Sequence, residues 1–277
     1  MKKLLFLSII ILSCTETNIV PAKQKIILDE NDLKNQIAMA KLSLLPGDSL
    51  DFIVFAGQSN CNNCTSPATS INGYVTWDVY KERLDTVMNR FQNYTQKLGP
   101  MYYLAPKLKA KFPHRKFIFL EFGKAATALV SDVSSAWRAD NKTTAGNFNL
   151  SYLLLTQMRN VIDVSGVPTR IDFFWLQGEE DNNSVWRTYQ KYEKKLYDTI
   201  PQFLHMSDNS VRYYTYLLKS STDPHYQDSI NYAKRLHAAS DPRITLFEVN
   251  VSQYQGIHMN CTTGIKACAD TLVKKIK

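Results

Sequence analysis

The chain contains 277 residues, of which 44% are hydrophobic, and its formal net charge is +8 at pH 7. This length fits one α/β domain with long loops, and the hydrophobic content excludes a largely disordered chain. Lys and Arg are scattered over predicted helices and form no basic block with interleaved aromatic residues, so the charge gives no reason to expect a nucleic-acid partner.

The N-terminus has the pattern of an export signal. Two lysines precede an apolar run over 4–12 that is too short to span a bilayer as a mature helix. The run leads to Cys14 after a small residue, which resembles the lipobox of bacterial lipoproteins. We therefore predict a lipoprotein signal peptide over 1–14, a tether and lead-in over 15–45, and one folded domain over 46–277. The expected location is an exported, membrane-anchored one, periplasmic or at the cell surface, with the lipid on Cys14 as the only membrane contact; an ordinary signal peptide with an incidental cysteine is the alternative.

Short apolar runs alternate with amphipathic stretches along the rest of the chain. The short runs are rich in β-branched and aromatic residues and predict strands, whereas the longer stretches have helical periodicity. Predicted strands cover 51–55, 116–122, 171–176, 211–217 and 244–249, and predicted helices cover 79–97, 101–111, 150–164, 186–206, 226–239 and 264–277. Five strands alternating with helices predict an α/β fold with a mostly parallel sheet covered on both faces.

Two serines in hydrolase-like contexts flank the first predicted strand. Ser49 stands in Gly-Asp-Ser-Leu before the strand, and Ser59 stands in Gly-Gln-Ser-Asn directly after it. Ligands of parallel α/β sheets bind at the carboxyl ends of the strands. Ser59 is therefore the candidate functional serine, whereas Gly-Asp-Ser-Leu is interpreted as a turn that enters the strand.

Two further polar segments accompany this serine. The segment 177–181 follows the third predicted strand, and His258 lies just before the C-terminal helix. A serine is a weak nucleophile until a base removes its proton, and a histidine oriented by a third group is the usual base. The three segments together predict an acyl-transfer site.

On these segments the sequence resembles the SGNH hydrolases, in particular the sialate O-acetylesterase and acetylxylan esterase branch of the carbohydrate esterases. Gly-Gln-Ser-Asn at 57–60 and Gln-Gly-Glu-x-Asp at 177–181 match that branch, and the segment at 99–105 resembles a family segment that leads into a helix. The resemblance covers about residues 50 to 275. It implies a flavodoxin-like SGNH hydrolase fold, a three-layer sandwich around a five-stranded sheet, with the esterase domain over 46–277.

The resemblance also implies roles for single residues. Ser59 would be the nucleophile and His258 the general base. The oxyanion hole would consist of the backbone N–H of Ser59, the side-chain amide of Gln177 and the N–H of Ala126. The candidate substrate-binding residues are Gln58, Asn60 and Trp137, with core packing as the alternative for the last.

One departure from the family pattern concerns the group that orients the histidine. Most SGNH enzymes have an aspartate three residues before it, where this chain has Gln255. A neutral amide cannot stabilise an imidazolium by charge. Either catalysis is weakened or another carboxylate serves. Since some members of the branch are thought to use the glutamate of Gln-Gly-Glu, the resemblance implies Glu179 as the third catalytic residue, in a Ser59–His258–Glu179 arrangement.

A second departure follows the second predicted strand. The family usually has Gly-Gly-Thr or Gly-Gly-Ser there, and this chain has Ala125-Ala126-Thr127. Alanine keeps the N–H but restricts the backbone, because only glycine takes positive φ readily. We expect either that this donor is kept in an ordinary conformation or that the oxyanion hole is altered.

Besides Cys14, the chain contains Cys61, Cys64, Cys261 and Cys268. In an exported protein two disulfides are expected, with three possible connectivities, and the local pairs Cys61–Cys64 and Cys261–Cys268 are the simplest. Cross-pairing and a zinc site built from all four cysteines are the alternatives.

The sequence therefore predicts an exported serine esterase that removes O-acetyl groups from a carbohydrate through an acetyl-enzyme on Ser59. An acetylated carbohydrate is the expected partner, and no metal, cofactor or nucleic acid is expected. A non-catalytic carbohydrate-binding relative is the first alternative, which Gln255 and the two alanines Ala125 and Ala126 favour. A thioesterase or lysophospholipase of the same superfamily is the second, and no long apolar lid segment supports it.

Overall fold

The structure is a computed structural model that describes residues 30–44, 49–62, 70–88, 97–130, 135–137, 148–181 and 185–277. The predicted signal peptide over 1–14, with Cys14, lies outside these residues. In the part of the chain that is described, no helix combines the length and the apolar character needed to cross a membrane.

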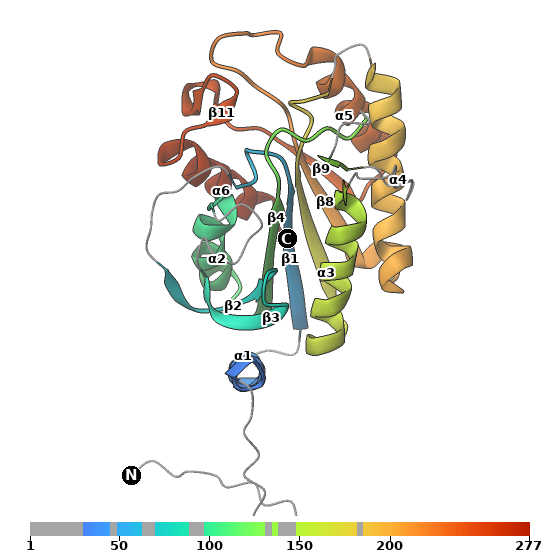
Figure 1. The fold of residues 1–277 in the computed structure, drawn as a ribbon. Helices are drawn as coiled ribbons and strands as arrows, with labels where there is room; N and C mark the ends of the chain where they lie inside the picture. The colour runs from blue at the N-terminus through green and yellow to red at the C-terminus, as the bar shows by residue number, and fades with distance from the viewer. Residues whose placement is uncertain are drawn as a thin grey trace, which may run out of the picture.

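A seven-stranded sheet forms the centre of the molecule (Figure 1). Its strands are β1 (Ser49–Gly57), β2 (Ile71–Asp78), β3 (Arg83–Met88), β4 (Arg115–Gly123), β7 (Arg170–Leu176), β8 (Val211–Tyr216) and β9 (Ile244–Phe247). They lie in the order β3-β2-β4-β1-β7-β8-β9, and all neighbours are parallel except the antiparallel β2–β3 pair. The α/β class and the mostly parallel sheet are confirmed, but the predicted number of five strands is wrong.

The two additional strands form a hairpin that includes part of the helix predicted over 79–97. The Asp78 carboxylate accepts hydrogen bonds from the N–H groups of Tyr80 and Lys81, each at 3.0 Å. Glu82 then takes a φ of 46°, and the chain reverses into β3. Such local side chain–backbone bonds compete with helix formation, which is why the described part of this range is a turn and a strand.

Helices cover both faces of the sheet (Figure 1). They are α1 (Glu30–Leu44), α2 (Pro100–Lys111), α3 (Leu150–Ser165), α4 (Trp186–Leu204), α5 (Asp228–Ser240) and α6 (Thr263–Lys275). α2 and α6 pack together on one face, and α3, α4 and α5 cover the other, so the arrangement has three layers. α1 lies in the range 15–45 that was predicted as tether and lead-in; it packs against β3 and buries Ala38 and Leu42. The shorter elements are β5 (Ser135–Ala136), β6 (Phe148–Asn149), β10 (Tyr254–Gln255), β11 (His258–Met259) and the 3₁₀ turns η3 (Asp208–Ser210) and η4 (Val251–Gln253).

The central strands are buried on both faces. β1 is buried over 51–57 and β7 over 171–176, as expected for parallel strands between two helix layers. Aromatic rings continue this packing from strand to strand, as where Phe55 stacks on Phe174 with 4.4 Å between ring centroids. Each large apolar side chain buried in this way contributes roughly 1.5–3 kcal/mol to stability. This packed layer fixes the carboxyl ends of the strands, which the candidate site residues follow.

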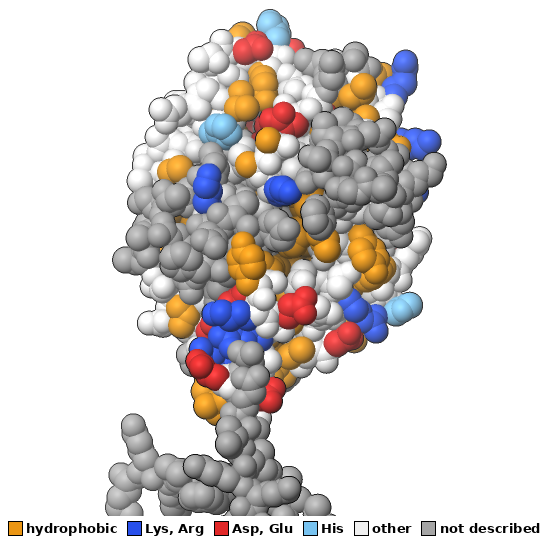
Figure 2. Space-filling model, in the orientation of Figure 1, with side chains coloured by type: hydrophobic (Ala, Val, Ile, Leu, Met, Phe, Trp, Pro, Cys, Tyr) orange, Lys and Arg blue, Asp and Glu red, His pale blue; other side chains and the backbone are white. Residues whose placement is uncertain are grey.

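The surface carries charges of both signs. On the face seen in Figure 2, Lys and Arg side chains are interspersed with Asp and Glu rather than gathered into one basic field. Many ion pairs are local helix pairs, such as Arg159 with Asp163 at 2.9 Å and Lys194 with Asp198 at 2.5 Å. Solvated ion pairs of this kind contribute about 0.3–0.5 kcal/mol each to stability. They indicate no binding site on this surface.

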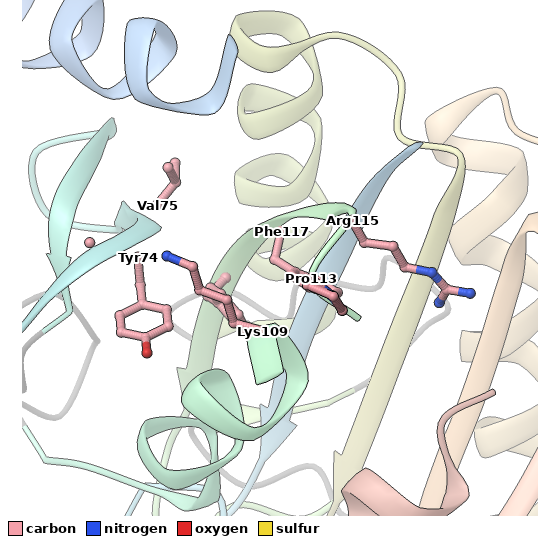
Figure 3. Close-up of a pocket in the computed structure, with 8 residues that line it drawn as sticks. Tyr74, Val75, Lys109, Pro113, Arg115 and Phe117 are labelled. Atoms are coloured by element: carbon pink, nitrogen blue, oxygen red, sulfur yellow. The ribbon is translucent and has the colours of Figure 1, made fainter. Parts of the chain in front are cut away.

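A pocket of about 200 Å³ lies between β2, β4 and the C-terminal end of α2 (Figure 3). Tyr74, Lys109 and Phe117 are among its lining residues, and the Lys109 ammonium lies 5.5 Å from the centroid of the Tyr74 ring. The pocket adjoins the amino-terminal half of β4. It is therefore separate from the carboxyl ends of the strands, where Ser59 lies.

Candidate active site

Ser59 and His258 lie within hydrogen-bond distance of each other at the carboxyl edge of the sheet. The Oγ of Ser59 is 2.9 Å from Nε2 of His258, although the two residues are 199 positions apart in the chain. Ser59 follows β1 in a turn, and His258 begins β11. Ser59 is 6% exposed and His258 is half-buried. A hydroxyl at this distance from an imidazole nitrogen is placed to transfer its proton to that nitrogen.

The turn that carries Ser59 requires glycine at position 57. Gly57 has a φ of 137°, and a Cβ there would lie 2.0 Å from the carbonyl oxygen of Leu176. The Gln58 N–H donates to the same carbonyl at 2.7 Å, and the Lys124 N–H donates to the Gly57 carbonyl at 2.9 Å. These bonds fix the serine turn between the ends of β7 and β4.

Asn60 joins Glu179 to the segment that carries His258. Its Nδ2 donates to Glu179 Oε1 at 2.7 Å and to the Ile257 carbonyl at 3.0 Å. Its Oδ1 accepts the Met259 N–H at 2.7 Å. Asn60 is 2% exposed, so these bonds are shielded from water. The residues on both sides of His258 are thereby held to the serine turn.

Among the described residues, hydrogen bonds connect Glu179 to the His258 segment through Asn60. The Oε1 of Glu179 accepts hydrogen bonds from Asn60 Nδ2 and from the Tyr216 hydroxyl, and its buried Oε2 has no hydrogen-bond partner among the described residues. No hydrogen bond joins Glu179 to His258, so the geometry differs from the expected Ser59–His258–Glu179 arrangement. The carboxylate is bound by Asn60 and Tyr216, and the role of Glu179 as third catalytic residue stays a prediction.

Burial sets the electrostatics of the 177–181 loop. Burial raises the pKa of Glu179, and the nearby Lys234 ammonium and the hydrogen bond from Asn60 oppose this rise. Burial also raises the pKa of Asp181, which hydrogen bonds from Gln177 and from backbone N–H groups oppose. The two carboxylates therefore depend on their donors and on Lys234 to keep their charge.

Gln177 is fully buried and its side-chain amide is already bonded. Its Nε2 donates to the Asp181 carboxylate at 2.6 Å and to the Thr127 carbonyl at 3.3 Å. The same carboxylate accepts the N–H groups of Leu129 and Val130. Both amide hydrogens of Gln177 are thus used to fix two loops together, which leaves none for the oxyanion that the sequence assigned to it.

The three residues predicted to contact substrate are buried. Gln58, Asn60 and Trp137 are 1%, 2% and 0% exposed. The Gln58 Oε1 accepts backbone N–H groups of the 177–181 loop, and the Trp137 indole N–H donates to the Thr127 hydroxyl at 2.8 Å. Their polar atoms are bonded within the fold, and Trp137 packs in the hydrophobic core. Contact of these residues with substrate stays a prediction.

The two backbone N–H groups that were predicted to bind the oxyanion have no acceptor among the described residues. Neither the N–H of Ser59 nor that of Ala126 donates a hydrogen bond to any residue that the structure describes. Ala126 lies in the loop after β4, which the Lys124 N–H ties to Gly57. Ala126 is exposed and has a φ of 54°, so an alanine here adopts the left-handed conformation that glycine favours.

The left-handed alanine predicts that Ala126→Gly stabilises the protein by about 1 kcal/mol, because the change removes the Cβ strain of that conformation. Thermal or urea unfolding measures the effect. Ala125→Gly is the matched control, since Ala125 is exposed and has no positive φ, and it should destabilise the protein slightly. Equal destabilisation by both changes would contradict the left-handed conformation.

Gln255 lies opposite His258 in the antiparallel β10–β11 pair. Gln255 is exposed, and within the described ranges no residue accepts a hydrogen bond from His258 Nδ1. The position of His258 therefore depends on its backbone, through the two bonds that Asn60 makes to Ile257 and Met259.

The cysteines do not pair as the simplest prediction had them. Cys61 and Cys268 are free and fully buried, so the local pairs Cys61–Cys64 and Cys261–Cys268 are wrong. Cys261 is disulfide-bonded, and Cys64 lies outside the described residues. Both free thiols pack in the hydrophobic core, and burial raises the pKa of each. Among the described residues there is no group of three or more side chains that could ligate a metal.

Two residues that support the site were not predicted from the sequence. The Tyr216 hydroxyl, at the end of β8, donates to Glu179. Lys234 on α5 donates from Nζ to the carbonyls of Gln177 and Tyr216 at 2.6 and 2.9 Å. The sequence contained a signal for Lys234. This lysine lies on the same helix face as Ile230 and His237, which is buried, and lysine is unusual on a buried face.

Comparisons with known proteins support the fold. No family model matches the chain, and no curated protein matches its sequence. Among solved structures, a protein from Arabidopsis thaliana has 11% identity and a TM-score of 0.63, over 82% of this chain and 98% of the other. NanS has 11% identity and a TM-score of 0.58, over 84% and 98%. A carbohydrate acetylesterase from Xanthomonas citri has 12% identity and a TM-score of 0.54, over 80% of this chain and 54% of that chain. At such low identity these likenesses show a shared fold.

Proposed function

We propose that this chain is a serine esterase that removes O-acetyl groups from a carbohydrate. The observation that carries the proposal is the 2.9 Å contact between Ser59 Oγ and His258 Nε2 at the carboxyl edge of the sheet. The fold that the chain shares with a carbohydrate acetylesterase supports the substrate class. The sequence motifs at 57–60 and 177–181 support the same branch of esterases.

In the first half of the reaction, Ser59 Oγ attacks the acetyl carbonyl while His258 Nε2 takes the hydroxyl proton. The carbonyl oxygen becomes an oxyanion, which the N–H groups of Ser59 and Ala126 would bind. The bond from the acetyl carbon to the sugar oxygen then breaks. The sugar leaves as an alcohol with the proton from His258, and the acetyl group stays on Ser59.

In the second half, His258 takes a proton from a water molecule, whose oxygen attacks the acetyl carbon. The bond to Ser59 Oγ breaks, the proton returns to Ser59, and acetate leaves. Asn60 and Glu179 hold the His258 segment in place through both halves. This role explains why the site has no aspartate at position 255 but does have the buried Glu179 carboxylate, which hydrogen bonds connect to the His258 segment through Asn60.

The proposal also places the protein outside the cytoplasm, attached to a membrane by a lipid on Cys14. The sequence pattern of 1–14 supports this part. A surface-anchored esterase would act on glycans that a cell processes outside its cytoplasm.

The test measures acetate release from 4-nitrophenyl acetate and from an acetylated oligosaccharide, together with the intact mass of the protein after acid quenching. We expect turnover of both substrates and a covalent adduct of one acetyl group on the peptide that contains Ser59. Folded protein that releases no acetate from any acetylated substrate would contradict the proposal.

A non-catalytic carbohydrate-binding relative is the second candidate. The exposed Gln255 favours it, because no carboxylate lies opposite His258 in the β10–β11 pair. Calorimetry with the same acetylated oligosaccharide separates the two candidates. Binding without acetate release and without an adduct on Ser59 would support the binding protein.

A further inference from the structure

Lys234 is a fully buried lysine beneath the 177–181 loop. It lies on α5 with 0% exposure, and its Nζ donates to the Gln177 carbonyl at 2.6 Å and to the Tyr216 carbonyl at 2.9 Å. These carbonyls lie at the ends of β7 and β8. Lysine is almost never buried completely unless its charge is paired, so the partner of this ammonium has to be identified.

Glycine at position 178 allows α5 to approach the loop. Gly178 has a φ of 126°, and a Cβ there would lie 2.9 Å from a side-chain carbon of Leu218 and 3.5 Å from the Lys234 ammonium. The ammonium also lies 4.8 Å from the centroid of the Tyr216 ring, which is the ring whose hydroxyl donates to Glu179. Lys234 is therefore packed against the same loop and the same tyrosine that position Glu179.

Three buried carboxylates, Glu193, Glu179 and Asp181, are near enough to Lys234 to raise its pKa. Two of them accept several hydrogen bonds. Asp181 accepts hydrogen bonds from the Gln177 amide and from two backbone N–H groups. Glu193, on α4, accepts from His237 Nδ1 at 2.9 Å and from two hydroxyls. Glu179 has only Asn60 and Tyr216, and one of its oxygens has no partner among the described residues. Glu179 is therefore the carboxylate whose charge depends most on a nearby cation.

The charges of Glu179 and Lys234 shift each other's pKa in the directions expected for an oppositely charged pair. Burial raises the pKa of Glu179, and Lys234 opposes the rise. Burial lowers the pKa of Lys234, and Glu193, Glu179 and Asp181 oppose the fall. Removal of the ammonium should therefore raise the pKa of Glu179 further.

We propose that Lys234 is a positioning residue for the esterase site, which favours the ionised form of Glu179 so that Glu179, through Asn60, holds His258 against Ser59. This inference rests on the proposed function, since it explains how the same site is held. A charged carboxylate accepts hydrogen bonds about twice as strongly as a neutral one, so loss of its charge would loosen the Asn60 link.

Other groups near this pair have to be included in any pH argument. Those facing Glu179 or Lys234 are Asp181 and Glu180 in the loop, Glu193 and Tyr189 on α4, Tyr216 on β8, Tyr226 before α5, Tyr254 on β10, Cys61 after β1 and, through Asn60, His258. A single pH profile contains contributions from all of them. The test therefore compares profiles between matched variants.

The experiment measures kcat/KM against pH with 4-nitrophenyl acetate for the wild type, Lys234→Met, Glu179→Gln and the double variant. We expect Lys234→Met to move the midpoint of the acidic limb to higher pH by about one unit, so its loss of activity is larger at acidic than at alkaline pH. In the Glu179→Gln background the same change should leave the midpoint where it was, because no titrating carboxylate remains at 179. Lys234→Gln, which keeps an N–H donor without the charge, should shift the midpoint as Lys234→Met does.

A purely structural role for Lys234 predicts a different pattern. With a purely structural role, Lys234→Met would lower activity equally at every pH and equally in both backgrounds. Identical midpoints of the acidic limb for wild type and Lys234→Met would overturn the inference. The Ser59→Ala variant tests the proposed function separately. If it hydrolyses 4-nitrophenyl acetate as fast as the wild type, the assay does not report on this site. In that event thermal unfolding of the four proteins decides: the inference requires Lys234→Met to lower the Tm more in the wild-type background than in Glu179→Gln, and equal losses refute it.

Discussion

Replacing Ser59 by alanine should reduce acetyl-ester hydrolysis by about 10⁵-fold or more, since the nucleophile and the acetyl-enzyme are lost together. The oxyanion donors and the imidazole remain, so a low residual rate above that of water is expected. Ser59 Oγ bonds to no other described residue than His258, and the loss of one such bond changes stability by only about 0.5–1.5 kcal/mol. The folded variant should therefore be almost inactive with nearly unchanged unfolding temperature, and no acetyl adduct should form on it.

Ser49→Ala is the matched control for this change. Ser49 begins β1 at the opposite end of the strand from Ser59 and pairs with Arg115 in the sheet register. Its removal should leave kcat/KM within about two-fold of the wild type. Full activity of Ser59→Ala, or loss of activity in Ser49→Ala without loss of folding, would show that the wrong serine has been assigned.

The contrast between the two serines shows how far the sequence predicts this site. Placing Ser59 required only two observations: that 51–55 is a buried strand and that ligands bind where parallel strands end. Both are local or general, and in the structure the serine follows the carboxyl end of β1, near His258. The bonds that position His258 are of another kind, because they join Asn60 to residues 197 and 199 positions away. No periodicity or motif spacing encodes such pairings.

Buried amides show where a motif says little about the role of a single residue. Gln58, Asn60 and Gln177 stand in motifs beside the serine and the carboxylate, which suggested contact with substrate or oxyanion. In the structure their amides hold the motif loops to one another. A motif shows which residue types occur together, but burial decides whether their polar atoms face a ligand or the fold.

The sheet edge shows a similar limit for the fold. The helices after position 100 and the five central strands follow hydrophobic periodicity and were predicted near their observed positions. The β2–β3 hairpin was missed because its turn depends on side-chain bonds from Asp78 and on a left-handed residue at Glu82. The α1 helix was missed as well, since among its residues with described burial only Ala38 and Leu42 are buried. Weakly amphipathic edge elements depend on tertiary contacts that a periodicity argument does not see.

Replacing His258 by alanine should lower kcat/KM for acetyl esters by about 10⁴-fold or more, because Ser59 then has no base within hydrogen-bond distance. The double variant Ser59→Ala/His258→Ala should be no less active than the worse single variant, since the two residues act as one unit. His225→Ala is the matched control. The His225 side chain is 85% exposed and, among the described residues, bonds only to the Asp228 carboxylate, so activity should stay within about two-fold. Additive losses in the double variant would mean that Ser59 and His258 serve different steps, and the 2.9 Å contact between them would then not be the catalytic one.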